Sequence, residues 1–438
     1  MAFIKHSYIM ILTKIIHFIC TLFVSIYIAR FFGPEAKGTY SLLLYFIEVI
    51  GLIGILGMNV SCLYYIGKNK YDIETIYLNS ILISLTNLIA VLMVFFVFRT
   101  LFFSTFLKGI YPNYIFLMIY CTPFLLVIWL STGILLGKNR IVTFSSLRIV
   151  YSLVLVLNFM FLAVALKMKL FGAIIGYFLT VLFTALINFI VIFKMSPLSF
   201  KINIAAIREM LSYGVRSSLE RVFQRLIYRT SFFLINYFTV LKLVGYYSIA
   251  LSLAEMILFI PAAVDTVLFP KLTSVNRKEA DHLTSRVSRS LLFLSIIIAL
   301  LFFVFAKPLI TLVFGLEYIP SITPLIILLP GIIMMSMYHA FSRNFSARGR
   351  PEINAFILLI CLMLNIIFNL FLIPRWGING AAWAATISYS ISVVVTILIF
   401  KNFSNLSLRN ILLVQVSDIK KVVIDTRSWF SKNLSSGD

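Results

Sequence analysis

Residues 353–373, INAFILLICLMLNIIFNLFLI, form an apolar stretch without a single charged side chain. A helix needs about 20 mainly apolar residues to cross the hydrocarbon core of a bilayer, so this stretch is long enough to span one. A second uncharged stretch, residues 379–400, follows after a connection of only a few residues. Two such segments in close succession predict a pair of membrane-spanning helices.

The composition of the whole chain extends this prediction to the entire protein. Of its 438 residues, 61% are hydrophobic and only 12% are charged, and the mean hydropathy is +1.05. Ordinary soluble domains carry about 25% charged residues, so this chain lacks the polar surface that a water-soluble protein needs. The period-2 alternation of a membrane barrel is absent and irregular backbone is disfavoured in lipid, so we expect helices.

Breaking the chain at clusters of polar residues, glycine and proline gives twelve candidate spans. They cover residues 8–29, 39–66, 76–98, 113–136, 141–166, 171–193, 211–238, 243–269, 288–306, 320–342, 353–373 and 379–400. The connections are short, so no segment between spans is long enough to form a domain outside the membrane. We therefore predict an all-α integral membrane protein with twelve transmembrane helices. The seventh span is the least apolar, and a cytoplasmic amphipathic helix is the alternative for it.

The charged residues predict the orientation of these spans. Lys and Arg together number 37 and Asp and Glu 15, which gives a formal net charge of +22. When Arg289, at the very start of the ninth span, is counted with the connection before it, 22 of the 37 cations fall on one side of the membrane, nine on the other side and six inside spans. Because cytoplasmic loops retain Lys and Arg, both termini are predicted to be cytoplasmic. A basic balance is also typical of nucleic-acid binding, but the chain has no soluble basic module, so no nucleic acid is expected as a partner.

An internal repeat divides the spans into two sets of six. With an offset of 207, five identities fall in one eleven-residue window. They pair Gly38, Tyr40, Ser41, Leu44 and Glu48 with Gly245, Tyr247, Ser248, Leu251 and Glu255. Because six is even, the two copies have the same orientation, as in transporters built from parallel repeats with the substrate site between the halves. We expect an N-terminal lobe at 1–200, a C-terminal lobe at 201–402 and a basic cytoplasmic tail at 403–438.

Four blocks of sequence resemble one family of membrane proteins. They are ARFFGPEAKGTYS at 29–41, VGYYSIA at 244–250, FGLEY at 314–318 and IPRWGINGAA at 373–382. In order and spacing they are similar to the polysaccharide flippases of O-antigen and capsule type, which belong to the multidrug/oligosaccharidyl-lipid/polysaccharide exporter superfamily. The resemblance departs at Ser231, where many relatives have an acid two residues after an arginine.

The resemblance implies two six-helix lobes in a V-shaped bundle with a central cavity. It also implies alternating-access translocation of undecaprenyl-diphosphate-linked oligosaccharide repeat units across the bacterial cytoplasmic (inner) membrane, for assembly of O-antigen lipopolysaccharide or capsule. Neither catalysis nor a cofactor is expected, while coupling to a proton or sodium gradient is left open. The expected partners are the lipid-linked oligosaccharide, membrane lipid, and the polysaccharide polymerase and chain-length machinery, and the protein itself is expected to be a monomer.

Four cations inside spans are the candidate substrate-binding residues. Arg221, Arg225 and Arg229 recur every four residues, so they form one stripe about 12 Å long on a helix. An arginine at the centre of a membrane helix costs roughly 2.5 to 3.5 kcal/mol, so the stripe must face a wet cavity or find partners. With Lys14 of the first span, it would supply the positive field and the bidentate hydrogen bonds that a diphosphate needs. For Lys14 the alternative is snorkelling toward the cytoplasmic headgroups.

Five further residues are secondary candidates for the cavity or for ion coupling. They are Glu48, Glu255, Arg30, Arg148 and Asn369. Glu48 and Glu255 are equivalent in the repeat, and they either balance the cations of the cavity or couple transport to an ion. Asn369 is a candidate either for hydrogen bonds to sugar hydroxyls or for bonding between helices. The four cysteines lie in apolar runs without metal-ligand spacing, so no metal site is expected.

Two other functions are kept as alternatives. A multidrug antiporter of the same superfamily needs an acidic and aromatic cavity for organic cations, whereas the predicted cavity is cationic. A polysaccharide polymerase or ligase needs an acid, a base or a nucleophile at the membrane face. The predicted external loops are short, and Glu35 and Glu317 are the acids they contain. The flippase hypothesis is therefore preferred.

Overall fold

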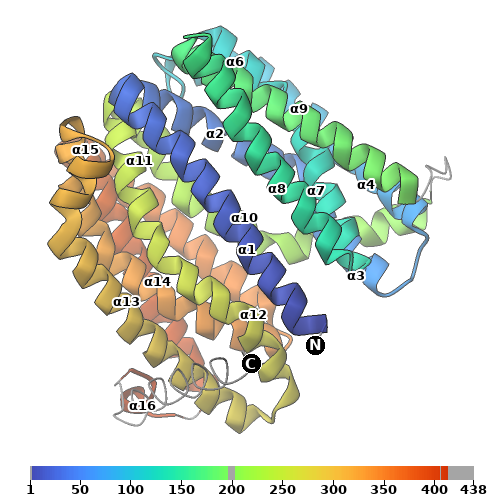
Figure 1. The fold of residues 1–438 in the computed structure, drawn as a ribbon. Coiled ribbons are helices and arrows are strands. Elements are labelled where there is room, and N and C mark those ends of the chain that lie inside the picture. The colour runs from blue at the N-terminus through green and yellow to red at the C-terminus, as the bar shows by residue number, and fades with distance from the viewer. Residues whose placement is uncertain (1, 196–202, 405, 413–438) are drawn as a thin grey trace, which may run out of the picture. The chain divides into compact units, whose positions relative to one another are not determined.

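The computed structural model describes residues 2–195, 203–404 and 406–412, and the predicted tail beyond residue 412 lies outside them. Every regular element in these ranges is a helix, which confirms the all-α prediction (Figure 1). The chain packs as two compact units, Met1–Ser248 with Val313–Glu317, and Ile249–Leu312 with Tyr318–Asp438. The lobe boundary at residue 200 stays a prediction.

The first unit contains the helices from α1 to α10 and the beginning of α11. Their bounds are α1 (Ala2–Tyr27), α2 (Gly33–Ile55), α3 (Met58–Gly67), α4 (Ile73–Val97), α5 (Arg99–Ser104), α6 (Pro112–Ile119), α7 (Thr122–Gly137), α8 (Ile141–Asn158), α9 (Lys169–Met195), α10 (Ile204–Phe238) and α11 (Leu241–Glu255). Two π-helical segments, Ile28–Phe32 and Phe159–Ala165, follow α1 and α8. Helix α1 packs along α8, and α9 packs against α7 and α8.

The predicted span at 39–66 is interrupted after Ile55. Leu56 and Gly57 both adopt left-handed backbone conformations, with φ of 45° and 72°, and this turn separates α2 from α3. Glycine is required at the second position, because a Cβ there would lie 2.1 Å from the carbonyl oxygen of Gly214 on α10. The break in the span therefore allows α10 to approach closely.

Polar contacts near its N-terminus hold α10 among the helices of the first unit. Asn203 caps the helix, since its side-chain oxygen accepts a hydrogen bond from the backbone N–H of Ala206 at 3.0 Å. The hydroxyl of Ser61 on α3 donates to the backbone carbonyl of Met210 at 2.6 Å. Along its length α10 packs against α2, α3 and α4. The helix that carries the predicted cationic stripe thus has a fixed place within the first unit.

The two copies of the repeat meet at their matched glycines. A Cβ on Gly38 of α2 would lie 2.0 Å from the carbonyl oxygen of Leu241. In return, a Cβ on Gly245 of α11 would lie 2.0 Å from the carbonyl oxygen of Pro34. The offset of 207 that pairs the two glycines also pairs Pro34 with Leu241. The contact is therefore reciprocal, as contacts across a two-fold axis are, and it supports the internal repeat.

The second unit contains the end of α11 and the helices that follow it. Their bounds are a 3₁₀ turn η3 (Met256–Leu258), α12 (Phe259–Ser274), α13 (Arg277–Val313), a 3₁₀ segment η4 (Leu316–Ser321), α14 (Ile322–Ala347), α15 (Pro351–Ser404) and α16 (Leu408–Leu412). Helix α15 consists of two helices joined at Gly377, whose φ of 54° and ψ of −131° are not helical. This kink falls in the connection that the sequence predicts between the spans at 353–373 and 379–400.

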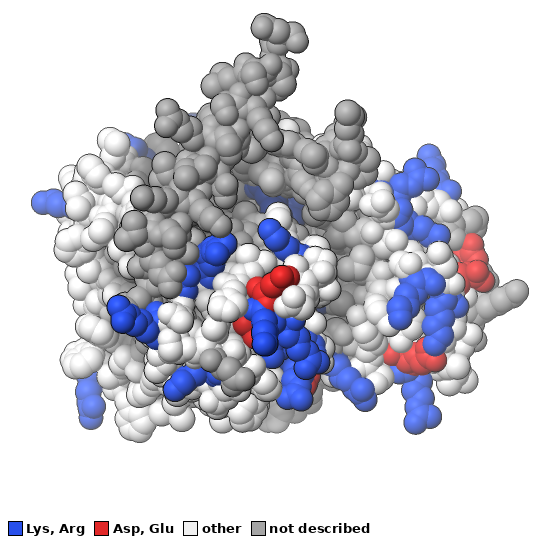
Figure 2. Space-filling model, turned by 90° about the horizontal axis from the view of Figure 1, so that it is seen from below, with Lys and Arg blue, Asp and Glu red and all other residues white. Residues whose placement is uncertain are grey.

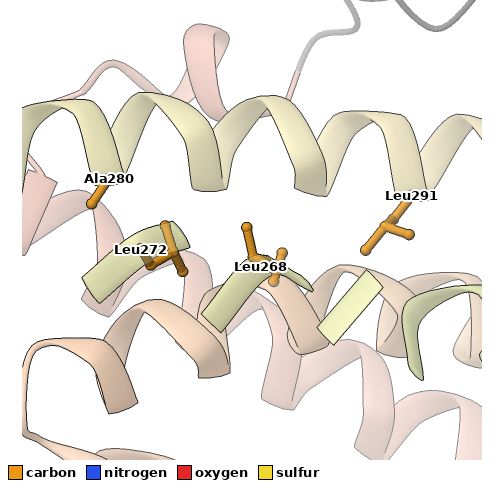
Figure 3. Close-up of a cluster of buried hydrophobic side chains, with 5 residues drawn as sticks. Leu268, Leu272, Ala280 and Leu291 are labelled. Atoms are coloured by element: carbon orange, nitrogen blue, oxygen red, sulfur yellow. The ribbon is translucent and has the colours of Figure 1, made fainter. Parts of the chain in front are cut away.

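A buried apolar cluster joins three helices of the second unit. Leu268 and Leu272 of α12 lie against Ala280 and Leu291 of α13, and Ala340 of α14 belongs to the same cluster (Figure 3). The two leucines are four residues apart, so they lie one above the other on one face of α12. This face is what packs α12 against its neighbours.

The helices are long and apolar enough for a multi-pass membrane protein. Nine helical stretches among the described residues meet that description, and two of them, Ile9–Ile55 and Pro351–Ser404, have 47 and 54 residues. A single crossing takes about 20 residues, so each of these two is long enough to cross twice. Helix α10 is not among the nine, because its arginines lower its hydropathy. The count of twelve spans stays a prediction.

Candidate functional site

An ion-pair cluster joins α2 to α10 in the first unit. Nε of Arg229 lies 3.1 Å from Oε2 of Glu48, and Nη1 of Arg225 lies 3.3 Å from the other carboxylate oxygen, Oε1. Both oxygens of one carboxylate are therefore occupied by guanidinium groups that come from successive turns of α10. Two of the three predicted stripe arginines and one of the predicted acids meet at this place, which we call the Glu48 cluster.

An aromatic wall packs against the buried arginine of the Glu48 cluster. The guanidinium carbon of Arg229 lies 4.1 Å from the centre of the Tyr45 ring, which is within cation–π range. The Tyr45 ring contacts Phe232 with a centroid distance of 4.4 Å, and Phe232 contacts Tyr247 with a centroid distance of 5.2 Å. The guanidinium group of Arg229 therefore contacts an aromatic ring as well as the carboxylate of Glu48.

The three charged side chains of the Glu48 cluster differ in their exposure to solvent. The exposed fraction of the side chain is 10% for Arg229, 27% for Glu48 and 52% for Arg225. One carboxylate faces two guanidinium groups, so the cluster keeps one net positive charge. Arg221, one turn earlier on α10, is also exposed. Arg225 therefore has the most exposed guanidinium group of the cluster, while Arg229 is held by Glu48 and Tyr45.

The structure places Lys14 and Arg148 on a different pair of helices, α1 and α8. Lys14 is exposed on α1. One turn further along, Nδ1 of His17 lies 2.9 Å from Oγ of Ser152, whose hydroxyl donates to the backbone carbonyl of Arg148 at 2.8 Å. Since a serine hydroxyl has one proton, His17 must donate through Nδ1 in this arrangement. The side chain of Arg148 is half-buried beside this contact.

The remaining predicted residues lie apart from the Glu48 cluster along the chain. Arg30 is exposed in the π-helical segment that follows α1. Glu255 is half-buried at the end of α11 and belongs to the second unit. Asn369 is fully buried in α15, where its amide donates to the backbone carbonyl and the side-chain oxygen of Asn365 at 2.7 and 2.9 Å. Asn365 in turn donates to Ser388 across the kink, so this pair bonds between helices.

Two charged features were not anticipated from the sequence. The predicted spans at 8–29 and 39–66 leave Lys37 in the connection between them, but α2 begins earlier and buries it, with Nζ donating to the hydroxyl of Ser41 at 3.0 Å. In the second unit, Asp265 of α12 pairs with His339 at 2.8 Å and with Arg343 at 3.4 Å, both on α14. The spacing of four residues in Lys37–Ser41 and in His339–Arg343 was the available signal, since such residues share a helix face.

No group of three or more His, Cys, Asp or Glu side chains within residues 2–195, 203–404 and 406–412 is arranged to hold a metal ion.

The fold of the chain is shared with solved membrane transport proteins. It is similar to the lipid II flippase MurJ in an inward closed conformation, with a TM-score of 0.77 and 16% identity, covering 99% of this chain and 93% of that one. It is also similar to an inward-facing multidrug resistance MATE family transporter of the MOP superfamily, with a TM-score of 0.72 and 15% identity, covering 89% and 94%. At these identities the likeness establishes the fold alone, and a fold does not by itself determine a function.

The family of the protein is identified by matches of its sequence to models of known families. Residues 3–276 match the model of the polysaccharide biosynthesis protein family, and residues 217–371 match the MatE model. Since the first match covers more than half of the chain, the protein belongs to the polysaccharide biosynthesis protein family. This confirms the family resemblance found in the four sequence blocks.

A curated relative matches over part of its length. The chain is 30% identical over 156 residues to the probable low-salt glycan biosynthesis flippase Agl15 of Haloferax volcanii, which is 35% of this chain and 33% of the relative. The aligned region thus spans about a third of the length of that relative.

Proposed function

We propose that the protein is a flippase that moves a lipid-linked oligosaccharide across the membrane for glycan assembly. The observation that carries the proposal is the Glu48 cluster, in which one carboxylate of α2 faces two guanidinium groups of α10, with the exposed Arg221 one turn earlier on α10. Membership of the polysaccharide biosynthesis protein family and the similarity to a named glycan flippase support it. In its specific form, the substrate is an undecaprenyl-diphosphate-linked repeat unit of O-antigen or capsule.

The chemistry of a diphosphate fits this arrangement of charges. A diphosphate carries two or more negative charges, which cannot enter hydrocarbon without compensation. Arg221 and Arg225 present planar, always charged guanidinium groups that bind phosphate oxygens in a bidentate way. Glu48 holds Arg225 in the absence of a substrate, and the arriving diphosphate takes the place of the carboxylate on that guanidinium group. Arg229 and Tyr45 keep Glu48 in position during this exchange.

The flippase proposal is tested with the full chain in vesicles that contain a lipid-linked oligosaccharide. We expect Arg221→Gln with Arg225→Gln to slow translocation by about tenfold or more, because each hydrogen bond to a charged group contributes about 1.5 to 3 kcal/mol. Arg99→Gln, which removes an exposed arginine from α5, is the matched control and should translocate like the wild type. Wild-type rates in the double variant would refute the assignment of the cluster.

A multidrug antiporter is the second candidate, because residues 217–371 match the MatE family model. The charge of the Glu48 cluster argues against it, since its carboxylate already faces two guanidinium groups and cannot serve an organic cation as well. Cells that express the protein should therefore show no added resistance to cationic dyes.

The remaining expectations extend the proposal to the cell. We propose the bacterial inner membrane as the location, cytoplasmic termini, a monomeric state, and the polysaccharide polymerase and chain-length machinery as partners. Figure 2 shows a face on which Lys and Arg predominate over Asp and Glu, as expected for a cytoplasmic face. Coupling to a proton or sodium gradient through Glu48 or Glu255 also stays a proposal.

A further inference from the structure

A groove of about 550 Å³ lies at the start of α10, away from the Glu48 cluster along the helix. Its walls include Tyr65 of α3 and, on α10, Arg208, Glu209, Ser212, Tyr213 and Arg216. This volume lies in the range of sites that bind small molecules or headgroups, about 300 to 1,000 Å³. All of these residues belong to the first unit.

The groove carries more positive than negative charge. Its acid, Glu209, is already paired, because its carboxylate lies 2.5 Å from Nζ of Lys70 and accepts a hydrogen bond from the hydroxyl of Tyr71 at 3.0 Å. These two partners hold the pKa of Glu209 below its usual range, so the acid stays ionised and compensated. Arg208 and Arg216 are both exposed, and neither forms an ion pair in the described part of the chain. The groove therefore offers two guanidinium groups to a ligand.

Stacked aromatic rings give the groove a rigid wall. The rings of Tyr64 and Tyr213 are stacked, with centroids 4.1 Å apart and planes at 21°. Tyr65 meets Tyr213 edge-on at 5.8 Å, and Nζ of Lys68 lies 4.7 Å from the centre of the Tyr64 ring. Together with the pairing of Glu209, these contacts tie the connection after α3 to the first turns of α10. A site with fixed walls binds its ligand at a smaller cost in conformational entropy.

The spacing of the polar groups indicates the kind of ligand. Arg208 and Arg216 are eight residues apart, about 12 Å along the axis of α10, and Ser212 lies between them. An extended headgroup that carries both an anion and hydroxyl groups matches this row better than a lone phosphate ion does. Arg221 and Arg225 of the stripe described above lie further along the same helix, with Arg221 about 140° around the axis from Arg216, so the row and the stripe belong to different faces of α10.

We propose that this groove is a second anion site, which holds the phosphate-bearing sugar headgroup of the lipid-linked substrate before it reaches the Glu48 cluster. Phosphate oxygens bind the guanidinium groups of Arg208 and Arg216, and sugar hydroxyls bind Ser212 and the tyrosines. The inference rests on the proposed function for the identity of the headgroup, but binding to the groove is measured independently of translocation.

The test measures binding to the full chain in nanodiscs, with two probes: a short-chain prenyl-diphosphate N-acetylglucosamine and inorganic pyrophosphate. We expect Arg208→Gln with Arg216→Gln to weaken binding of the prenyl-diphosphate sugar by about tenfold or more. Pyrophosphate should bind more weakly than the sugar probe. Arg277→Gln with Lys278→Gln removes the same charge from the start of α13 and should leave binding unchanged. Arg208→Lys with Arg216→Lys, which keeps the charge, should bind with intermediate affinity and verifies that the site still folds.

Several results would overturn the inference. Unchanged binding in the Arg208→Gln, Arg216→Gln variant would do so, as would equal affinity for pyrophosphate and the sugar probe. A nanodisc with phosphatidylglycerol in place of a neutral lipid separates the two sources of phosphate, and loss of binding there would assign the groove to ordinary lipid headgroups. If the wild type translocates and the variant both binds and translocates normally, the groove assignment alone fails. If the wild type binds but does not translocate, the proposed function fails.

Discussion

Glu48 forms ion pairs with two arginines that differ in their burial. It compensates Arg229, which is nearly buried, and Arg225, which is half exposed, through separate carboxylate oxygens. Removing one partner of a buried ion pair is far more costly than removing one partner of an exposed pair, because the remaining charge loses its compensation. The contribution of Glu48 to folding therefore comes mainly from Arg229, and its contribution to ligand binding from Arg225.

We expect Glu48→Gln to destabilise the protein by about 3 kcal/mol, toward the lower end of the range for broken buried pairs because Glu48 is partly exposed. The measurement is the thermal unfolding midpoint of the purified chain in detergent. Adding Arg229→Gln to Glu48→Gln should recover part of the loss, since the uncompensated cation is then gone. A midpoint that does not change in the single variant would contradict the role given to this pair.

The pair between Lys70 and Glu209 predicts a pH dependence with a defined sign. Because the pKa of Glu209 is lowered by Lys70 and Tyr71, the pair stabilises the folded protein above the unfolded pKa of about 4.3. That contribution is lost as the pH falls through the lower folded pKa. Carbon-13 NMR of labelled glutamate should place the titration of Glu209 below that of free glutamate. In Lys70→Gln it should move upward, and an unmoved titration would show that Lys70 is not the cause.

At the scale of elements, close helix contacts through glycine decide where α2, α10 and α11 meet. Because Gly57 has no side chain, the backbone of Gly214 on α10 can approach it closely. In the same way, Gly38 and Gly245 allow the backbones of α2 and α11 to approach each other. In each case a carbonyl oxygen occupies the place of a Cβ, so a larger residue requires the backbone to shift. Such contacts combine segments that are far apart in the sequence, and they set the position of the Glu48 cluster between α2 and α10.

We expect Gly38→Ala to destabilise the protein by about 1 to 3 kcal/mol, the usual cost of overpacking. Gly67→Ala is the matched control, since nothing lies within 4 Å of a Cβ at that position, and it should be neutral or slightly stabilising. Thermal unfolding of both variants and of Gly38→Ala with Gly245→Ala is the measurement. The double variant should cost less than the sum of the two single changes, because the first displacement makes room for both side chains. Strict additivity would argue against a shared contact.

The sequence predicts the positions of these helices better than their contacts. Apolar length indicates most helices of both units and the connection near Gly377, because each span needs its own run of apolar residues, and α10 is the one for which this signal is weak. The break at Leu56–Gly57 is hidden inside an apolar run, and nothing in the local sequence sets it apart. The pairing of Glu48 with Arg229 joins residues 181 positions apart. Such a contact depends on tertiary packing, so the sequence indicated that the stripe needs partners without identifying them.

At the scale of the whole molecule, the excess of cations predicts how the chain is oriented. Lys278 lies in the predicted cytoplasmic connection between the spans at 243–269 and 288–306, where the structure begins α13, and Tyr111 lies in the predicted external connection before α6. Both are exposed, so a cysteine at either position is open to a reagent in the adjoining water.

We expect a membrane-impermeant thiol reagent to label Tyr111→Cys in intact cells and Lys278→Cys only after the membrane is opened. The background is a chain whose four native cysteines have been replaced, since all four are free. The wild-type rate of translocation in that background shows that the chain has folded. Labelling with the opposite pattern would reverse the assigned orientation.

The reciprocal contact between Gly38 and Gly245 has a consequence for heredity. Each glycine is kept small by a carbonyl oxygen that belongs to the other copy of the repeat, Leu241 in one direction and Pro34 in the other. Because the two copies of the repeat contact each other at these positions, a substitution in one copy restricts the residues that the other copy can accept there. A genetic selection for suppressors of a damaging change at Gly38 should therefore yield second changes around residue 241, in the other half of the gene, more often than changes beside the original lesion.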